Sequence, residues 1–183
     1  MKFFILLIIA MLFQQPQVIN LKEYYCGEGV IFDGKVAFPF KITNFNKNHT
    51  PTLDEIKKGK KETHWMWFIF PQIKGLGKSD TANLYAINDL KEATDYLEHP
   101  ILGKHLIEIS ELLLTFKMKS ADGIFGDLDA RKLRSCMTLF SLVENANPIF
   151  QEILDAFFSG ETDPLTLSII NSTIKSVDEP VAL

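Results

Sequence analysis

Two short stretches of the chain contain side chains that are suited to chemistry. The first, HWMWFIFPQ at residues 64–72, holds both tryptophans of the protein and begins with a histidine. The second, KLRSCMTLF at residues 132–140, places two basic residues next to a serine and a cysteine. Aromatic faces stack on rings, and arginine or lysine can hold a phosphate or a carboxylate. Together the stretches favour an anionic, ring-bearing ligand such as a nucleotide or an ADP-ribose-like molecule.

The candidate ligand-binding residues are Trp65, Trp67, Gln72, Lys132, Arg134 and Ser135. His64 is the candidate catalytic residue, because an ordinary histidine pKa lies near neutrality and suits a general base. A structural interpretation stays open for each of them. The tryptophans could be core residues, a histidine beside tryptophans is often structural, and a basic residue in an apolar helix can simply flank the core. Trp65 and Trp67 would share one face of an extended chain but diverge by about 200° in a helix.

Other classes of site find little support. Cys26, Cys136 and four scattered histidines match no metal-ligand spacing, so we expect no metal and no cofactor. Ser135 and Cys136 belong to no nucleophile motif. A net charge of -4 and a pI of about 5.6 disfavour general nucleic-acid binding.

The first twenty residues are similar to a secretory signal peptide. Lys2 precedes an apolar run at residues 3–13, which is too short to span a bilayer, although residues 14–20 lack the small-residue cleavage pattern. A buried strand or helix and a wrongly assigned start are the alternatives. We expect the secretory pathway if the segment is a signal and the cytoplasm otherwise, with no transmembrane span in either case.

The remaining chain predicts a mainly α fold, a compact multi-helix single domain with a short N-terminal β-hairpin-like extension. In the extension, residues 21–51, Asp33-Gly34 separates two apolar runs, which is a strong hairpin signal. Helices fill residues 52–170, and residues 171–183 form a flexible tail. The expected helix starts are a brief helix at residues 53–58, Ser79, an Asp89/Glu92 capping box, Pro100, Ser120, Asp127 or Asp129, Asn147-Pro148 and Asp163-Pro164.

The HWMWFIFPQ and KLRSCMTLF blocks, with Gly75-Leu76-Gly77 between them, closely resemble the domain-of-unknown-function family eighteen-ten. The resemblance covers residues 52–170 and implies a mostly α-helical domain with no established activity, so it assigns no catalytic residue. Some members carry the label calpastatin. That label implies protease inhibition, but the inhibitor is a disordered, repeat-bearing chain, unlike this apolar one.

Two functional hypotheses follow. The first is a structural or protein-interaction module, in which both blocks serve packing or present a surface to a partner protein. The alternative is a small-molecule binding protein or enzyme that uses His64, the two tryptophans, Lys132 and Arg134. Whether the protein is an enzyme, and which ligand or partner it takes, is open at the level of sequence.

Overall fold

The structure is a computed structural model of the whole chain, and the part that it describes comprises residues 31–32, 35–36 and 50–178, with side chains at residues 50–174. The chain divides into two units, Met1–Pro39 and Phe40–Leu183. The signal-like segment at residues 1–20 lies outside the described residues.

In the first unit, strand β1 (Ile31–Phe32) pairs antiparallel with strand β2 (Lys35–Val36), and Ile31 lies opposite Val36. The Asp33-Gly34 turn predicted between them lies outside the described residues. The hairpin as a whole therefore stays a prediction.

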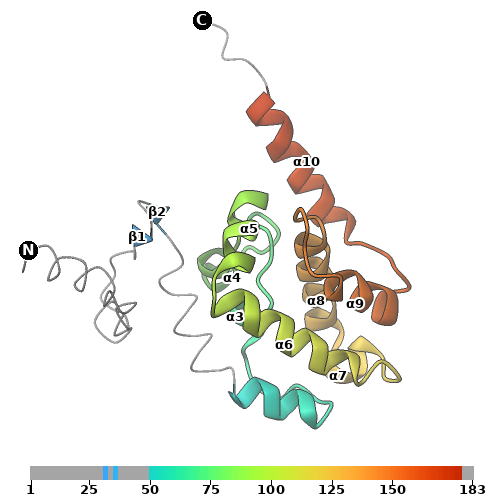
Figure 1. Cartoon of the computed structure of the whole chain (residues 1–183). Coiled ribbons are helices and arrows are strands. Elements are labelled where there is room, and N and C mark those ends of the chain that lie inside the picture. The colour runs from blue at the N-terminus through green and yellow to red at the C-terminus, as the bar shows by residue number, and fades with distance from the viewer. Residues whose placement is uncertain (1–30, 33–34, 37–49, 179–183) are drawn as a thin grey trace, which may run out of the picture. The chain divides into compact units, whose positions relative to one another are not determined.

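The second unit is helical, which confirms the mainly α fold class. A helix at residues 50–57 comes first. It is followed by α3 (Met66–Ile69), α4 (Asp80–Tyr85), α5 (Leu90–Glu98), α6 (Leu102–Leu114), α7 (Ala121–Phe125), α8 (Asp127–Ser141), α9 (Ile149–Phe158) and α10 (Pro164–Asp178) (Figure 1). None of the helices in the described part is long and apolar enough to cross a membrane.

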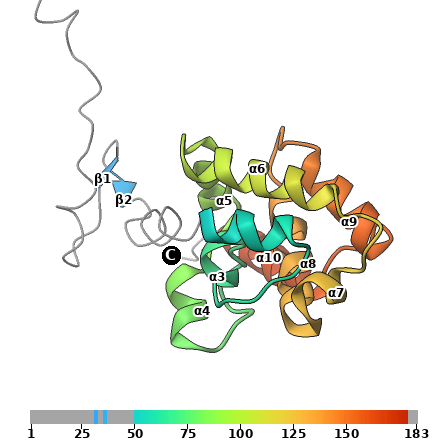
Figure 2. The ribbon, with the colours of Figure 1, turned by 90° about the horizontal axis from the view of Figure 1, so that it is seen from below.

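Helix α8 forms the centre of this unit. It packs against α5, α7, α9 and α10, while α6 packs against α5 and α9 (Figures 1 and 2). One apolar stripe of α6 faces this core, because Leu102, Leu106, Ile109 and Leu113 are all fully buried. An aromatic cluster continues the core, and its members are Tyr96, Phe140 and Phe150.

Two serines begin helices as predicted. The Ser79 hydroxyl accepts a hydrogen bond from the Ala82 amide at 3.1 Å, and α4 starts at the next residue. The Ser120 hydroxyl accepts from the Gly123 amide at 3.1 Å at the start of α7. Both bonds use groups within three residues of each other, so they depend little on the rest of the fold.

The capping box of α5 forms with one change. Asp89 accepts from the Glu92 amide at 2.7 Å, as predicted. Glu92 reaches back to the amide of Asn88, at 2.7 Å, rather than to that of Asp89. The carboxylate therefore satisfies a donor one residue further from the helix than in the standard motif.

The start of α6 was predicted wrongly. Pro100 does not lie in the first turn, since the helix begins at Leu102. His99 provides the cap instead, because its Nδ1 atom accepts from the amides of Ile101 and Leu102 at 3.2 and 3.3 Å. Burial lowers the pKa of His99, which favours the neutral imidazole that this acceptor role requires.

Helix α4 ends at Tyr85, and α10 runs beyond residue 170, where the helical domain was predicted to end. The chain turns extended after Tyr85, and Ile87 forms a parallel bridge with Ile73 instead of continuing the helix. Helix α10 runs to Asp178, so residues 171–178 are helical rather than part of a flexible tail. Its final turns extend past the ends of α5 and α8 (Figure 1).

Candidate functional site

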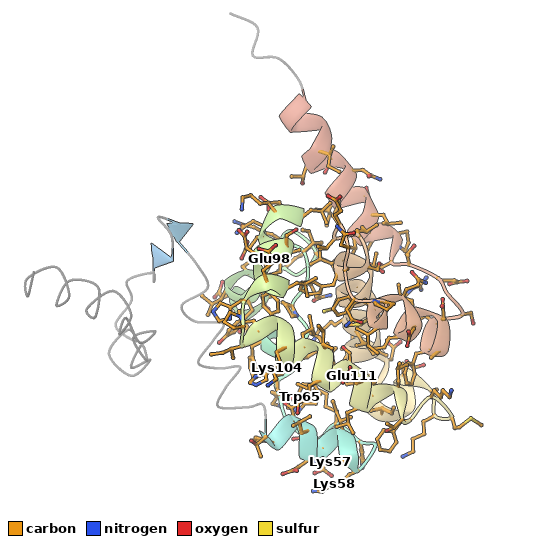
Figure 3. All side chains as sticks on the ribbon, viewed as in Figure 1. Lys57, Lys58, Trp65, Glu98, Lys104 and Glu111 are labelled. Carbon is orange, nitrogen blue, oxygen red and sulfur yellow. The ribbon has the colours of Figure 1, made fainter. Side chains whose placement is uncertain are left out.

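Trp65 is a core residue with one polar anchor. It precedes the single turn of α3 and is 1% exposed, and its ring lies 6.3 and 6.1 Å from the rings of Phe70 and Phe125. Its indole N–H donates to Glu55 at 2.7 Å. Figure 3 shows Trp65 between the helix at residues 50–57 and the rest of the unit. The indole thus joins this first helix to the core.

Glu55 is a buried carboxylate that collects four hydrogen bonds. Besides Trp65, its donors are the amides of Glu62 and Thr63, at 2.7 and 3.1 Å, and the Thr63 hydroxyl. Burial raises the pKa of Glu55, but the hydrogen bonds outweigh it and lower the pKa to about 2. The carboxylate therefore stays charged at neutral pH and holds the loop that leads to Trp65.

Sequence reasoning missed Glu55. A signal was present, because Glu55 follows Thr52 by three residues and precedes Ile56, and all three are buried on one face of the helix at residues 50–57. An acidic residue on such a face needs internal donors, and the following loop provides them. By contrast, Lys57 at the end of this helix and Lys58 just after it are exposed (Figure 3).

A second polar group joins Lys61 and Lys132 through Asp129. The Asp129 carboxylate lies 2.7 Å from the Lys61 ammonium and 2.8 Å from that of Lys132. Burial raises the pKa of Asp129, but the two lysines lower it further than burial raises it. Lys61 also donates to the Thr63 carbonyl oxygen at 2.7 Å, and its side chain is only 8% exposed. Asp129 was predicted to cap α8, and it instead bridges two lysines from different segments.

The same lysines lie over the tryptophan rings. The Lys61 nitrogen is 5.1 Å from the ring centre of Trp65, and the Lys132 nitrogen is 4.2 Å from that of Trp67. Two ammonium groups share the Asp129 carboxylate, and the charged Glu55 carboxylate bonds to the Trp65 indole, so the network holds two positive and two negative charges. Trp67 is half-buried, so part of its ring reaches solvent beside Lys132.

Arg134 and Ser135 belong to a different part of the structure. Arg134 donates to the Glu161 carboxylate at 2.9 Å and to the Thr162 carbonyl oxygen at 2.8 Å. Ser135 donates to Asp163 at 3.0 Å. These bonds fasten the loop between α9 and α10. Lys132 and Arg134 point in different directions, because side chains two positions apart in an α-helix differ by about 200° around the helix axis.

Asp163 completes this fastening. Its carboxylate accepts from the Thr166 amide at 3.0 Å and so caps α10 as predicted, while its own amide donates to the Thr138 hydroxyl at 2.8 Å. The polar residues of the KLRSCMTLF block thus hold the start of α10 against α8. Cys136 of the same block is fully buried, and burial raises the pKa of its thiol, which disfavours a thiolate nucleophile.

His64 directly precedes Trp65, whereas Gln72 lies beside Ile87. The His64 side chain is exposed, and Gln72 is half-buried with its backbone carbonyl accepting from the Ile87 amide at 2.9 Å. The structure therefore brings Trp65, Trp67 and Lys132 into one network, adds Glu55 and Asp129 to it, and places Arg134 and Ser135 elsewhere. Ligand binding by any of these residues stays a prediction. Within the described residues, no group of three or more histidine, cysteine or acidic side chains could hold a metal ion.

Two pockets lie outside this network. The first, of about 380 Å³, opens between the start of α5 and α10 and is lined mainly by Ile73, Leu90, Ile170 and Ile174. The second, of about 360 Å³, lies at the other end of α5, against the segment that joins α8 to α9.

Comparison with known proteins identifies the family. A family described as "Protein of unknown function (DUF1810)" matches residues 40–170 of this chain. The chain belongs to the DUF1810 family. The DUF1810 match begins at residue 40, earlier than the resemblance at residues 52–170 suggested, so part of the expected extension falls within the family domain.

A solved DUF1810-like structure supports this assignment. The chain is 37% identical to the conserved hypothetical protein Rv1873 from Mycobacterium tuberculosis, over 72% of this chain and 94% of that one, with a TM-score of 0.70. A comparison with proteins of curated function gave no match. Neither the DUF1810 family nor this structural relative carries an established activity.

Proposed function

We propose that this DUF1810 domain is a non-enzymatic protein-interaction module whose contact surface is the apolar groove between α5 and α10. One observation carries the proposal. The groove has a volume of about 380 Å³, and its walls are mostly aliphatic. Ile174 on its edge is 47% exposed, which is unusual for an isoleucine that adjoins a core.

The geometry of the signature blocks is consistent with a structural role. The Glu55 and Asp129 carboxylates are saturated by donors within the protein, and Arg134 is engaged by the loop before α10. Reaction centres usually keep such groups available to a substrate. The polar side chains of the two blocks and of Glu55 and Asp129 fasten loops to helices and so support a rigid surface.

The partner that fits the groove is a second copy of this chain. Helix α10 carries both a wall of the groove and the protruding Ile174, so a twofold contact would place the isoleucine of each copy in the groove of the other. Asp89 and Lys91 line the rim of the groove, and both are engaged within the chain, Asp89 by the Glu92 amide and Lys91 by Asp95. A contact confined to one such groove predicts a weak dimer that forms as the protein concentration rises.

Sedimentation of the full chain tests this proposal. We expect the wild type to form dimers as its concentration rises and Ile174→Asp to stay monomeric. Leu165→Asp is the matched control, because Leu165 lies on the same helix, is 63% exposed and does not line the groove. Circular dichroism would confirm that both variants fold. A wild type that stays monomeric, or an Ile174→Asp variant that associates as strongly as Leu165→Asp, would contradict the proposal.

The small-ligand alternative is supported by the Lys132 ammonium, which lies 4.2 Å from the ring centre of Trp67. Lys132 covers one region of this half-buried ring, and an anionic ring-bearing ligand could stack there and neutralise the lysine. In this alternative His64 transfers a proton and Gln72 contacts the ligand. A thermal-shift series with nucleotides and sugar phosphates tests it. We expect stabilisation of the wild type and of Arg131→Gln but not of Lys132→Gln, and no stabilisation of the wild type would exclude this alternative.

The N-terminal expectations also remain proposals. Residues 1–20 would act as a secretory signal, and the Asp33-Gly34 turn would close a hairpin in the extension. The mass of the mature protein tests the first point, since removal of a signal would leave a chain lighter than the full sequence. An intact mass would contradict it.

A further inference from the structure

The second pocket lies away from both the network around Trp65 and Lys132 and the α5–α10 groove. It is formed by the last turn of α5, Ile107 of α6, the segment after α8 and Phe150 of α9. Figure 3 shows Glu98, which lines it, well separated from Trp65. Its volume of about 360 Å³ lies at the lower end of the range of roughly 300 to 1,000 Å³ for small-molecule sites.

The floor of this pocket is apolar. Leu97, Ile107, Val143 and Phe150 line it, and the last two belong to the core, with exposures of 7% and 0%. An aliphatic chain of a few carbons would gain contact area there, because each methylene removed from water contributes about 0.8 kcal/mol to transfer into an apolar environment.

The rim of the pocket is acidic and has no basic residue. Glu98 and Glu144 both line it, and neither forms an ion pair with any residue that the structure describes. The other polar side chains on the lining are those of Thr94, Asn145 and Asn147, and their oxygen atoms are further acceptors.

Two helix C-terminal ends add to this negative potential, and the N-terminal end of α9, which begins at Ile149 between the lining residues Asn147 and Phe150, opposes it. Glu98 is the last residue of α5, and Glu144 lies three residues after Ser141, where α8 ends. The C-terminal end of a helix carries a partial negative charge, so it attracts cations. Carboxylates at these positions repel the helix ends, and a bound cation would relieve that repulsion.

We propose that this pocket binds an organic cation, an ammonium group on a short aliphatic chain, with the charge at Glu98 and Glu144 and the chain over Leu97, Ile107, Val143 and Phe150. The apolar floor favours this ligand over a metal ion, because a metal ion binds oxygen ligands and would make no use of the aliphatic side chains.

Titration calorimetry of the full chain with n-hexylammonium chloride tests the proposal. We expect weak binding that becomes about three- to tenfold weaker in Glu98→Gln and in Glu144→Gln, and undetectable in the double variant. Glu111→Gln is the matched control, because Glu111 is an exposed acid on α6 that does not line the pocket. It should bind as the wild type does.

Sodium hexanoate, which has a similar apolar chain and the opposite charge, separates charge recognition from simple apolar binding. We expect no hexanoate binding. The proposal would be overturned if the wild type bound no hexylammonium, if hexanoate bound equally well, or if the double variant kept wild-type affinity while its thermal unfolding midpoint was unchanged. If this test fails, the proposal that the α5–α10 groove is an interaction surface is not affected, since the two sites share no lining residue.

Discussion

The indole N–H of Trp65 donates a 2.7 Å hydrogen bond to the buried, charged carboxylate of Glu55. This contact crosses from the core to the first helix of the described domain. It explains why a tryptophan, rather than another large apolar residue, occupies position 65, because phenylalanine could fill the space but could not donate to the acid.

We therefore expect Trp65→Phe to lower the free energy of unfolding by about 2 to 3 kcal/mol, since it removes one donor from a buried carboxylate and some core volume. Trp67→Phe is the matched control. Trp67 is half-buried, and its replacement should cost less than about 1 kcal/mol. Urea unfolding of the two variants measures the difference. Equal losses would show that the Glu55 bond contributes nothing specific.

Glu55 should make the domain sensitive to acid. Its pKa falls from 4.5 to about 2 on folding. A lowered pKa stabilises the folded state fully above the unfolded pKa, and this stability is lost as the pH falls from about 4.5 toward 2. The loss attributable to this group is about 3 kcal/mol.

Glu55→Gln provides the comparison. We expect this variant to be less stable than the wild type at neutral pH and to lose less stability between pH 4.5 and 2, when both are measured by urea unfolding across that range. Parallel pH profiles for the two proteins would show that another group dominates the acid response.

Two aspartates at the start of α8 should contribute very different amounts to the free energy of unfolding. Asp129 is largely buried between two lysines, so Asp129→Asn leaves the Lys61 charge without its counter-ion and should cost about 2 to 4 kcal/mol. Asp127 pairs with Arg131 on the surface, where both side chains are about 70% exposed, so Asp127→Asn should cost at most about 1 kcal/mol. Unfolding at low and high salt checks this, because only the surface pair is strongly screened.

Gly103 should tolerate no side chain. A Cβ at this position would overlap the carbonyl oxygen of Leu97, where α6 passes the end of α5. We expect Gly103→Ala to destabilise the domain by about 3 kcal/mol. Gly126 is the comparison, since it has a positive φ of 76° but open space around it, and Gly126→Ala should cost about 1 to 2 kcal/mol. Thermal unfolding ranks the two, and a larger loss at Gly126 would contradict the close approach at Gly103.

The features that the sequence by itself determined are local ones. Ser79, Ser120 and Asp163 cap their helices because a side-chain oxygen meets an amide three residues away, which needs no tertiary contact. The α6 stripe was likewise readable, because helical periodicity alone places its residues on one face. The family also followed from sequence, since two specific blocks identify it.

Only the tertiary structure decided what the two blocks contact. Glu55 and Trp65 lie ten residues apart, and their hydrogen bond depends on how the intervening loop folds back on the helix. Lys132 and Arg134 are near neighbours in sequence, and periodicity shows that they diverge, but it cannot show that one meets Trp67 and the other the loop before α10. These partners come from distant segments, and only the packing of whole helices brings them together. Composition and spacing could therefore suggest one anion site. In the structure Lys132 and Arg134 instead make contacts in two separate places.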